Sequence, residues 1–388
     1  MLTDRQDSID IMMRKWAPRK CRLFSLSLLI VLAWPTTALG VGDSSGLAFD
    51  QNPEAVSSRL EQIRSSHQIP GLWVAASSGG RIVYAQALGA KWVNGASATV
   101  DDSLPIGSIS KYITADLTCI LISQGKLKSQ ATVQSIFPQL TSEPCFSATI
   151  VDLLSHRSGF PRDHIPWLED PNSAESRAQW RQSQLLTFAG LEEMDRRGYR
   201  AKERAQSPNT AETYSNFAYS VLGTIAEKVV GKPMESVFAE YMFKPFGMGS
   251  ARFGIPNPSG KDTDQPLGHF TQNAEGAWLP FVNWHDQTEP RSMAATSAGG
   301  IQMTVQDLCR YLTWRCYGPS AKNAPYNSQI MATLWRQDQQ VDSASGATSG
   351  YWAWFRIDRN RKVVVVYIAN ANLTEVQRNA LESYLSGL

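Results

Sequence analysis

The sequence has little charge imbalance and few cysteines or histidines. Its 388 residues carry 37 Lys and Arg against 35 Asp and Glu, a net charge of +2. This balance provides no basic stripe to hold a nucleic-acid backbone, so nucleic acid is not an expected partner. Five cysteines are too few for a disulfide scaffold, and no CxxC, HExxH or HxHxD pattern occurs. The five histidines are scattered, so we expect neither a metal site nor a cofactor.

A long hydrophobic run is also missing. The apolar stretch at residues 23–34 has twelve residues, fewer than the roughly 20 that a membrane-spanning helix needs. Six basic residues precede it and Ala38-Leu39-Gly40 follows it, which predicts a secretory signal peptide over residues 1–40. An uncleaved anchor is the alternative. Cleavage would leave a protein of net charge near −1, periplasmic or secreted, without a stable membrane anchor.

Export would permit disulfides among the four cysteines that follow the leader. Cys119 lies in a strongly apolar segment, so a buried free thiol is favoured over a bridge to Cys145. Cys309 and Cys316 are seven residues apart on an expected helix, about 10 Å by helical rise, which is too far for a bridge unless the helix ends between them.

Hydrophobic spacing predicts strands near both ends of the chain and helices between them. The expected strands are residues 72–76, 81–88, 351–357 and 362–369. The expected helices include 53–67, 108–123, 218–230 and 376–388. Residues 163–210 are expected to form a polar helical insertion, and residues 251–292 to form loops.

Strands at both ends imply one sheet assembled from the two ends of the chain. We therefore predict a single split domain over residues 48–388. Its sheet subdomain would comprise about 48–105 and 293–388, and its helical subdomain about 106–292.

Ser108 and Lys111 open the apolar segment 108–123. Residues three apart lie on the same face of a helix, where a lysine amine can accept the proton of a serine nucleophile. Burial favours this role because it lowers the pKa of a lysine. Ser123 and Lys126 match the same pattern, but Gly125 lies between them at the helix end, so no rigid pair is expected.

Tyr214-Ser215-Asn216 lies just before another apolar segment, residues 218–230. A tyrosine hydroxyl can transfer a proton to or from the serine, and an asparagine amide can contact a substrate carbonyl. A helix cap is the simpler alternative, with Ser215 or Asn216 accepting backbone N–H groups.

A third segment, ahead of a hydrophobic hairpin, reads Ser345-Gly346-Ala347-Thr348-Ser349-Gly350-Tyr351. Together with the Ser108–Lys111 and Tyr214–Asn216 motifs, it resembles the three ordered motifs of the serine β-lactamase and penicillin-binding protein family. The tyrosine is similar to that of class C β-lactamases, D-Ala-D-Ala carboxypeptidases and their esterase relatives. Further matching segments are residues 153–160, 243–248 and 298–301. The resemblance implies an α/β (α+β) fold of the β-lactamase/transpeptidase type, an antiparallel sheet flanked by helices with an inserted helical subdomain.

By that resemblance Ser108 is the acylated nucleophile, and Lys111 and Tyr214 are the proton-transfer pair. Asn216 would contact the substrate amide, and the backbone N–H groups of Ser108 and Ala347 would form the oxyanion hole. The predicted substrate-binding set is Asn216, Ser345, Gly346 and Ala347.

Ala344 departs from the family pattern, because the third motif usually begins with Lys, or in esterase-like members with His or Trp. The missing cation weakens the expectation of penicillin or D-Ala-D-Ala substrates and favours an uncharged ester or amide. Arg291 or His269 could supply a substitute charge, although an exposed arginine and a structural histidine are the simpler interpretations.

Other candidates are weaker. Asp152 and His156 could form a catalytic dyad, but a structural role at a helix end is favoured. Trp167 and Trp284 lie in loop-rich segments and could form the rim of a cleft, while Trp352 and Trp354 are expected to pack on one face of a strand.

We therefore predict a serine hydrolase, a monomer, that acts on a small-molecule or peptide substrate such as a β-lactam, a D-Ala-D-Ala peptide of peptidoglycan origin or a small ester. The alternative is a non-catalytic or weakly active binder or sensor of cell-wall peptides that has kept the fold.

Overall fold

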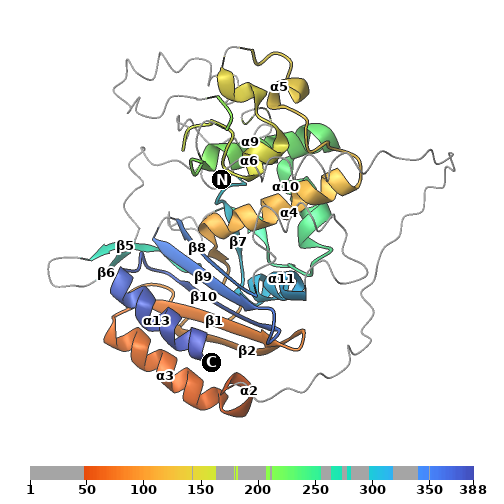
Figure 1. Cartoon of the computed structure of the whole chain (residues 1–388). Coiled ribbons are helices and arrows are strands. Elements are labelled where there is room, and N and C mark those ends of the chain that lie inside the picture. Colours follow the sequence, from red (N-terminus) through yellow and green to blue (C-terminus); the bar gives the residue numbers. More distant parts are fainter. Residues whose placement is uncertain are drawn as a thin grey trace, which may run out of the picture. The chain divides into compact units, whose positions relative to one another are not determined.

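A five-stranded antiparallel sheet forms the centre of the fold (Figure 1). The structure, a computed structural model, describes residues 48–141, 143–162, 179, 181, 207–209, 212–254, 264–272, 278–280, 297–317, 340–348 and 350–388. The predicted leader and most of the predicted insertion at 163–210 lie outside these residues. The sheet has the order β2-β1-β10-β9-β8, so β8 is an edge strand. Its strands are β1 (Gly71–Ser78), β2 (Arg81–Gly89), β8 (Val341–Thr348), β9 (Tyr351–Asp358) and β10 (Val363–Ala369).

The two ends of the chain meet in the middle of this sheet. β1 pairs with β10 along its whole length, from Leu72 opposite Ala369 to Ser78 opposite Val363. All neighbouring strands are antiparallel, as the alternating hairpins of the sequence predict. The expected antiparallel sheet flanked by helices is thus confirmed. The subdomain boundaries remain a prediction.

Side chains alternate between the two faces of the sheet, and each face has its own helices. Leu72 and Val74 of β1 pack against α3 (Pro53–Ser66) and α13 (Glu375–Gly387). Trp73 and Ala75 face the other way, into the core that contains α4 (Ser110–Ser123) and α11 (Val305–Tyr317). Figure 1 shows the two helix pairs on opposite sides of the sheet.

Local sequence signals set the ends of these helices. Asn52 caps α3 by accepting from the Ala55 backbone N–H, and Pro53 fits the first turn because it needs no hydrogen-bond partner there. Thr374 and Gln377 form a reciprocal capping box at the start of α13. The short helix α2 (Ala48–Gln51) precedes α3.

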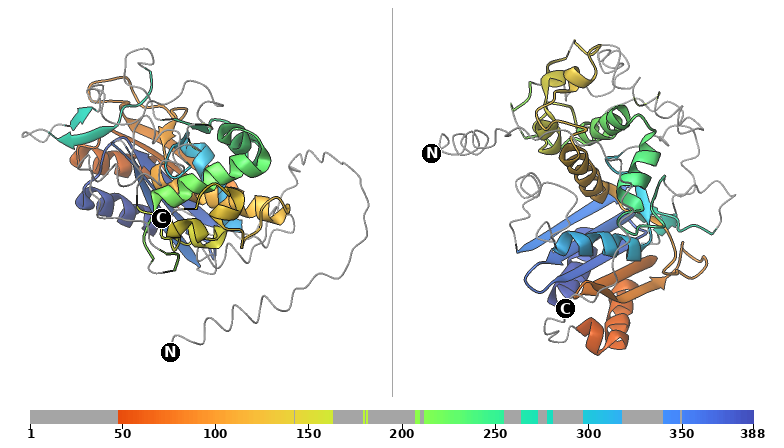
Figure 2. Two further views of the ribbon diagram at one scale, coloured as in Figure 1. Left: turned by 90° about the horizontal axis from the view of Figure 1, so that it is seen from above. Right: turned by 90° about the vertical axis from the view of Figure 1, so that its right-hand side faces the viewer.

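A group of helices extends from the end of the sheet at which α4 begins (Figure 1, Figure 2). It contains α5 (Val133–Ile136), α6 (Ile150–Leu154), α9 (Asn216–Val230), α10 (Met234–Phe238) and two short helical turns, Pro144–Ser147 and Ala239–Phe243. α4 is apolar on nearly all sides because it passes between this group and the sheet. Among the described residues, no helix is long and apolar enough to cross a bilayer.

The predicted loop segment 251–292 contains short strands that the sequence did not indicate. β4 (Arg252–Phe253) joins β3 (Leu104–Pro105) and β7 (Ile301–Met303) in a small sheet of order β3-β7-β4. β5 (His269–Gln272) pairs with β6 (Trp278–Pro280). Strands of two to four residues are too short to show a period-two pattern, so their pairing with other segments defines them.

Cys119, Cys145, Cys309 and Cys316 are separate buried thiols. The expectation of a free Cys119 is confirmed, and Cys309 and Cys316 lie on α11 as expected. Burial raises the pKa of all four thiols, so none is in the reactive thiolate form.

Candidate active site

A tight turn at the edge of the sheet presents Ser108. Gly107–Ile109 form a short helical turn that leads directly into α4. Gly107 has a positive φ of 53°, and a Cβ built there would lie 2.7 Å from the Ala347 backbone N. A Cβ on Gly346 would lie 2.3 Å from the Ile106 carbonyl oxygen and 2.7 Å from the Ser108 N. Glycine at both positions therefore lets β8 contact the turn backbone to backbone, with the amides of Ser108 and Ala347 at this contact.

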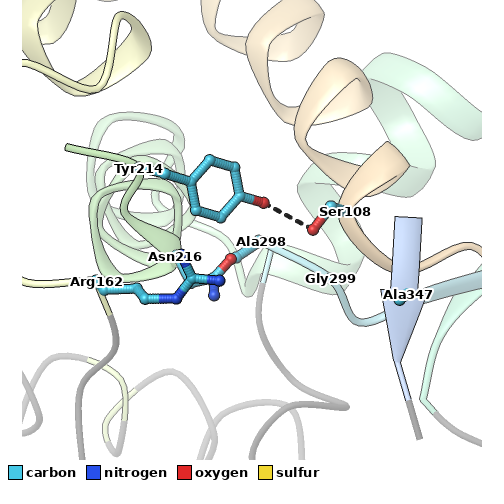
Figure 3. Close-up of a pocket in the computed structure, with 7 residues that line it drawn as sticks. All are labelled: Ser108, Arg162, Tyr214, Asn216, Ala298, Gly299 and Ala347. Carbon is cyan, nitrogen blue, oxygen red and sulfur yellow. Dashed lines mark hydrogen bonds between the residues drawn. The ribbon is translucent and has the colours of Figure 1, made fainter. Parts of the chain in front are cut away.

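The three predicted catalytic side chains meet at this turn. Ser108 Oγ and Tyr214 Oη share a hydrogen bond of 2.7 Å, and Lys111 Nζ donates to Ser108 Oγ at 3.2 Å. Figure 3 shows the tyrosine hydroxyl pointing at the serine. The serine hydroxyl is thus in hydrogen-bond contact with two groups that can exchange its proton.

Lys111 is buried, with 2% of its surface exposed. Its ammonium also donates to the Ala298 carbonyl oxygen at 2.7 Å, and lies 4.8 Å from the Tyr214 ring centroid and 5.8 Å from that of Tyr219. These contacts fix the amine beneath Ser108, one helical turn along the chain.

The Tyr214-Ser215-Asn216 motif is both a helix cap and part of the site. Ser215 is the N-cap of α9: its Oγ accepts from the Ala218 N at 2.9 Å and donates to the Pro161 carbonyl oxygen at 2.6 Å. Tyr214 and Asn216 flank this cap and both line the pocket. The motif can therefore be a helix cap and part of the site at once, because the cap at Ser215 orients the neighbouring Tyr214 and Asn216.

His156 supports the motif from behind. Its Nδ1 accepts from the Ser215 backbone N at 3.1 Å, and its ring lies 4.7 Å from the Tyr214 ring. Burial, assisted by the nearby charge of Lys111, lowers the pKa of His156 to about 4. The imidazole is therefore neutral near pH 7, as an Nδ1 acceptor must be. Asp152, its suggested dyad partner, instead forms the capping box of α6 with Thr149.

A cavity of about 360 Å³ opens beside Ser108. Figure 3 shows the seven residues that line it. They are Ser108, Arg162, Tyr214, Asn216, Ala298, Gly299 and Ala347. Four of the seven were predicted site residues. A pocket with one serine hydroxyl and a few convergent polar groups is suited to a small polar ligand.

Two other predicted residues lie on β8, and Ala344 lies beside them. Ser345 is exposed, Gly346 is in the close contact with the turn, and Ala344 is half-buried opposite Phe355 of β9. The methyl group of Ala344 packs against the hydrophobic core, so no charge enters the site at this position.

Of the two proposed substitute cations, His269 is the one that the structure describes, and it does not line the pocket. His269 is fully buried, its Nδ1 lies 2.6 Å from the Asn370 carbonyl oxygen, and its Nε2 accepts from the Val93 N, so its role is structural. Arg291, Trp167 and Trp284 lie outside the described residues. Trp354 is buried and stacks on Tyr367, as expected for packing.

Three pocket residues, Arg162, Ala298 and Gly299, were not predicted site residues, and of these Arg162 alone lies outside the segments that match the family. It follows Pro161 at the end of the 153–160 segment, and its guanidinium carbon lies 5.3 Å from the Tyr214 ring centroid. The only sequence signal was its place two residues after a segment shared with the family.

This fold and this group of side chains define a class of serine hydrolases. The model of the beta-lactamase family matches residues 56–385, and the chain belongs to this family. Its members include β-lactamases and D-Ala-D-Ala carboxypeptidases.

One relative is the D-alanyl-D-alanine-carboxypeptidase/endopeptidase AmpH of Escherichia coli strain K12. It is 25% identical over 222 residues, which are 56% of this chain and 50% of that protein. The chain therefore spans about half the length of this relative.

Solved structures show the same fold. A class C beta-lactamase superposes with a TM-score of 0.66 at 19% identity, covering 89% of this chain and 98% of that one. The octameric penicillin-binding protein homologue from Pyrococcus abyssi has a TM-score of 0.63 at 20% identity, with coverages of 86% and 78%.

Proposed function

We propose that this protein is an exported serine hydrolase that acts through an acyl-enzyme on Ser108. The observation that carries the proposal is the hydroxyl of Ser108, bonded to Tyr214 at 2.7 Å and Lys111 at 3.2 Å, at the wall of a cavity. The basic and then apolar pattern of residues 1–40 supports export. The family membership supports substrates that are esters or amides: a β-lactam, a D-Ala-D-Ala peptide or a small ester.

In the first step Ser108 Oγ attacks the substrate carbonyl carbon and gives its proton to the Lys111–Tyr214 pair. The negative charge on the tetrahedral oxygen is stabilised by the backbone N–H groups of Ser108 and Ala347. The bond to the leaving group then breaks, and the leaving group takes the proton from the same pair. A water molecule attacks the acyl-serine, releases the acid and restores the Ser108 hydroxyl.

A second candidate is a non-catalytic binder of cell-wall peptides. The observation that favours it is Ala344, which leaves the start of the third motif without a cation. A binder would hold its ligand without a covalent bond to Ser108, so the two candidates differ in one measurable property.

The test is intact-mass measurement after incubation with a fluorophosphonate, and in parallel with a penicillin, a D-Ala-D-Ala peptide and a para-nitrophenyl ester. We expect a single fluorophosphonate adduct that is lost in Ser108→Ala. Ser123→Ala is the matched control: Ser123 begins the second Ser-x-x-Lys match, and its hydroxyl donates to the Ile120 carbonyl oxygen. Absence of any adduct, or an adduct that persists in Ser108→Ala, would contradict the proposal and favour the binder.

A further inference from the structure

One side of α4 carries buried polar side chains just after Ser108. Three of them, Ser110, Lys111 and Thr114, bond to residues 297–301, a segment distant in the sequence that is here named the anchor segment. Residues three and four apart share a side of a helix, so one turn of α4 presents all three side chains to the anchor segment. Buried polar groups need hydrogen-bond partners, and these contacts therefore fix where the anchor segment lies.

The hydroxyls of α4 hold the two ends of the anchor segment. Ser110 Oγ accepts from the Ile301 backbone N at 3.2 Å. Thr114 Oγ1 lies 2.7 Å from the Ser297 carbonyl oxygen and 3.1 Å from the Ser110 carbonyl oxygen. A hydroxyl has one hydrogen to donate, and the shorter distance makes the Ser297 carbonyl oxygen its main acceptor.

Ser297 also joins the anchor segment to α9. It is fully buried, and its Oγ donates to the Tyr219 carbonyl oxygen at 2.6 Å. A Cβ built on Gly223 would lie 2.3 Å from this Oγ, so α9 has room for the hydroxyl only because it presents bare backbone there. Ser297 is therefore bonded both to the helix that carries Lys111 and to the helix whose N-cap orients Tyr214.

The residue after Ser297 supplies an acceptor for the Lys111 amine. Lys111 Nζ donates to the Ala298 carbonyl oxygen at 2.7 Å, a shorter distance than the 3.2 Å to Ser108 Oγ. A lysine amine is a point charge on a flexible four-carbon stem, so fixed acceptors must set its position. A shift of the Ala298 carbonyl would therefore change the distance between the amine and the serine hydroxyl.

We propose that Thr114 and Ser297 are positioning residues that hold the Ala298 carbonyl, and through it the Lys111 amine, in place for proton transfer with Ser108. The inference rests on the proposed hydrolase function and adds two residues to its machinery. Neither is among the residues that line the cavity, so a substitution should change the rate of the reaction and not the binding of substrate.

Thr114→Val tests the proposal, because valine has nearly the shape of threonine but no hydroxyl. The Ser297 carbonyl oxygen loses this donor, and the anchor segment is released from α4 at that end. We expect kcat for para-nitrophenyl acetate to fall about tenfold or more, with KM within about twofold of wild type. The rate of fluorophosphonate adduct formation at Ser108 should fall with kcat. Ser297→Ala, which removes the bond to Tyr219, should lower the same two rates.

The controls separate positioning from helix stability. Thr114→Ser keeps the hydroxyl and should restore both rates. Thr118→Val is the matched variant: Thr118 is buried on the same side of α4, and its Oγ1 donates to the Thr114 carbonyl oxygen within the helix. It should leave both rates within about twofold of wild type. All rates are measured below the melting temperature of each variant, and Ser297→Ala decides if Thr114→Val does not fold.

Wild-type rates in Thr114→Val would overturn the proposal. Equal losses in Thr114→Val and Thr118→Val, or no recovery in Thr114→Ser, would overturn it as well, because the losses would then follow from the stability of α4 alone. Failure of the proposed function is a different result: wild type would then hydrolyse no ester and form no adduct on Ser108.

Discussion

The ring of His156 packs against the ring of Tyr214, and the backbone φ of His156 is positive. Its φ of 58° lies in the left-handed region, where asparagine and histidine are among the more tolerated residues. Its neutral Nδ1 accepts from Ser215, so protonation would remove the acceptor and bring a second positive charge close to Lys111. The protonation state of this single ring is therefore linked to the position of Tyr214.

The stability of the protein should depend on His156 in acid. The pKa is about 4 in the folded protein against an ordinary value of 6.5, so between these values the unfolded chain binds more protons. The stabilisation is complete above about pH 6.5 and is lost as the pH falls toward 4, by roughly 3 kcal/mol. Urea unfolding at pH 7, 5 and 4 measures it.

His156→Asn is the matched variant, because asparagine tolerates the positive φ and offers an acceptor oxygen to Ser215. Carboxylates also titrate in this range, so the quantity of interest is the difference between wild type and variant. We expect the variant to lose less stability than wild type between pH 7 and 4. Parallel pH profiles for the two proteins would contradict this role of His156.

The edge strand β8 and the turn Gly107–Ile109 form one functional unit. Among the described strands, β8 has no neighbour on its outer side, and its inner partner β9 fixes its register, with Ala347 opposite Trp352. The unit depends on the absence of a side chain at Gly346, because the strand and the turn are in backbone contact there.

Gly346→Ala should separate the two amides of the proposed oxyanion hole. The new Cβ would lie 2.3 Å from the Ile106 carbonyl oxygen, so strand or turn must move. We expect kcat for a para-nitrophenyl ester to fall roughly 100-fold, as when one oxyanion donor is lost. The free energy of unfolding should fall by about 1–3 kcal/mol through overpacking.

Gly387→Ala is the control, since a Cβ at that position, in α13, meets nothing within 4 Å. It should leave both kcat and stability close to wild type. A Gly346→Ala protein with wild-type kcat would show that the close contact between β8 and the turn does not serve the reaction.

The described part of the molecule has two hydrophobic cores on opposite faces of one sheet. The core with α4 and α11 lies beneath the candidate site, and the core with α3 and α13 lies on the far face. The two cores share only the sheet. Substitutions in the far core should therefore change stability without changing the chemistry of the site.

Leu381→Ala in α13 tests this separation. Leu381 is fully buried in the far core, so its truncation should lower the free energy of unfolding by about 2–5 kcal/mol. At a temperature where the variant is folded, kcat for an ester substrate should equal that of wild type. Val376→Ala, on the same helix but 68% exposed, should change stability by less than about 0.5 kcal/mol. A parallel loss of kcat in Leu381→Ala would contradict the independence of the two faces.

Much of the fold could be predicted because its signals are local. Helices such as α3, α4 and α13 have apolar spacing and capping residues within a few positions, and the two hairpins have strong β-rich runs. The short strands β4, β5 and β6 could not be predicted, because their pairing partners rather than their own composition determine them.

In the candidate site, too, the sequence predicts the contacts between near neighbours in the chain, and tertiary packing determines the others. The sequence alone placed Ser108 near Lys111, because residues three apart in a helical segment must share a face. Ser108 contacts Tyr214 at 2.7 Å although the two are 106 residues apart, and β8 closely approaches Gly107. Both contacts depend on the packing of α9 and the sheet around α4. The same packing places the half-buried Ala344 against the core and brings Arg162 into the pocket, because the position of a side chain across a cavity is set by long-range contacts that no local pattern encodes.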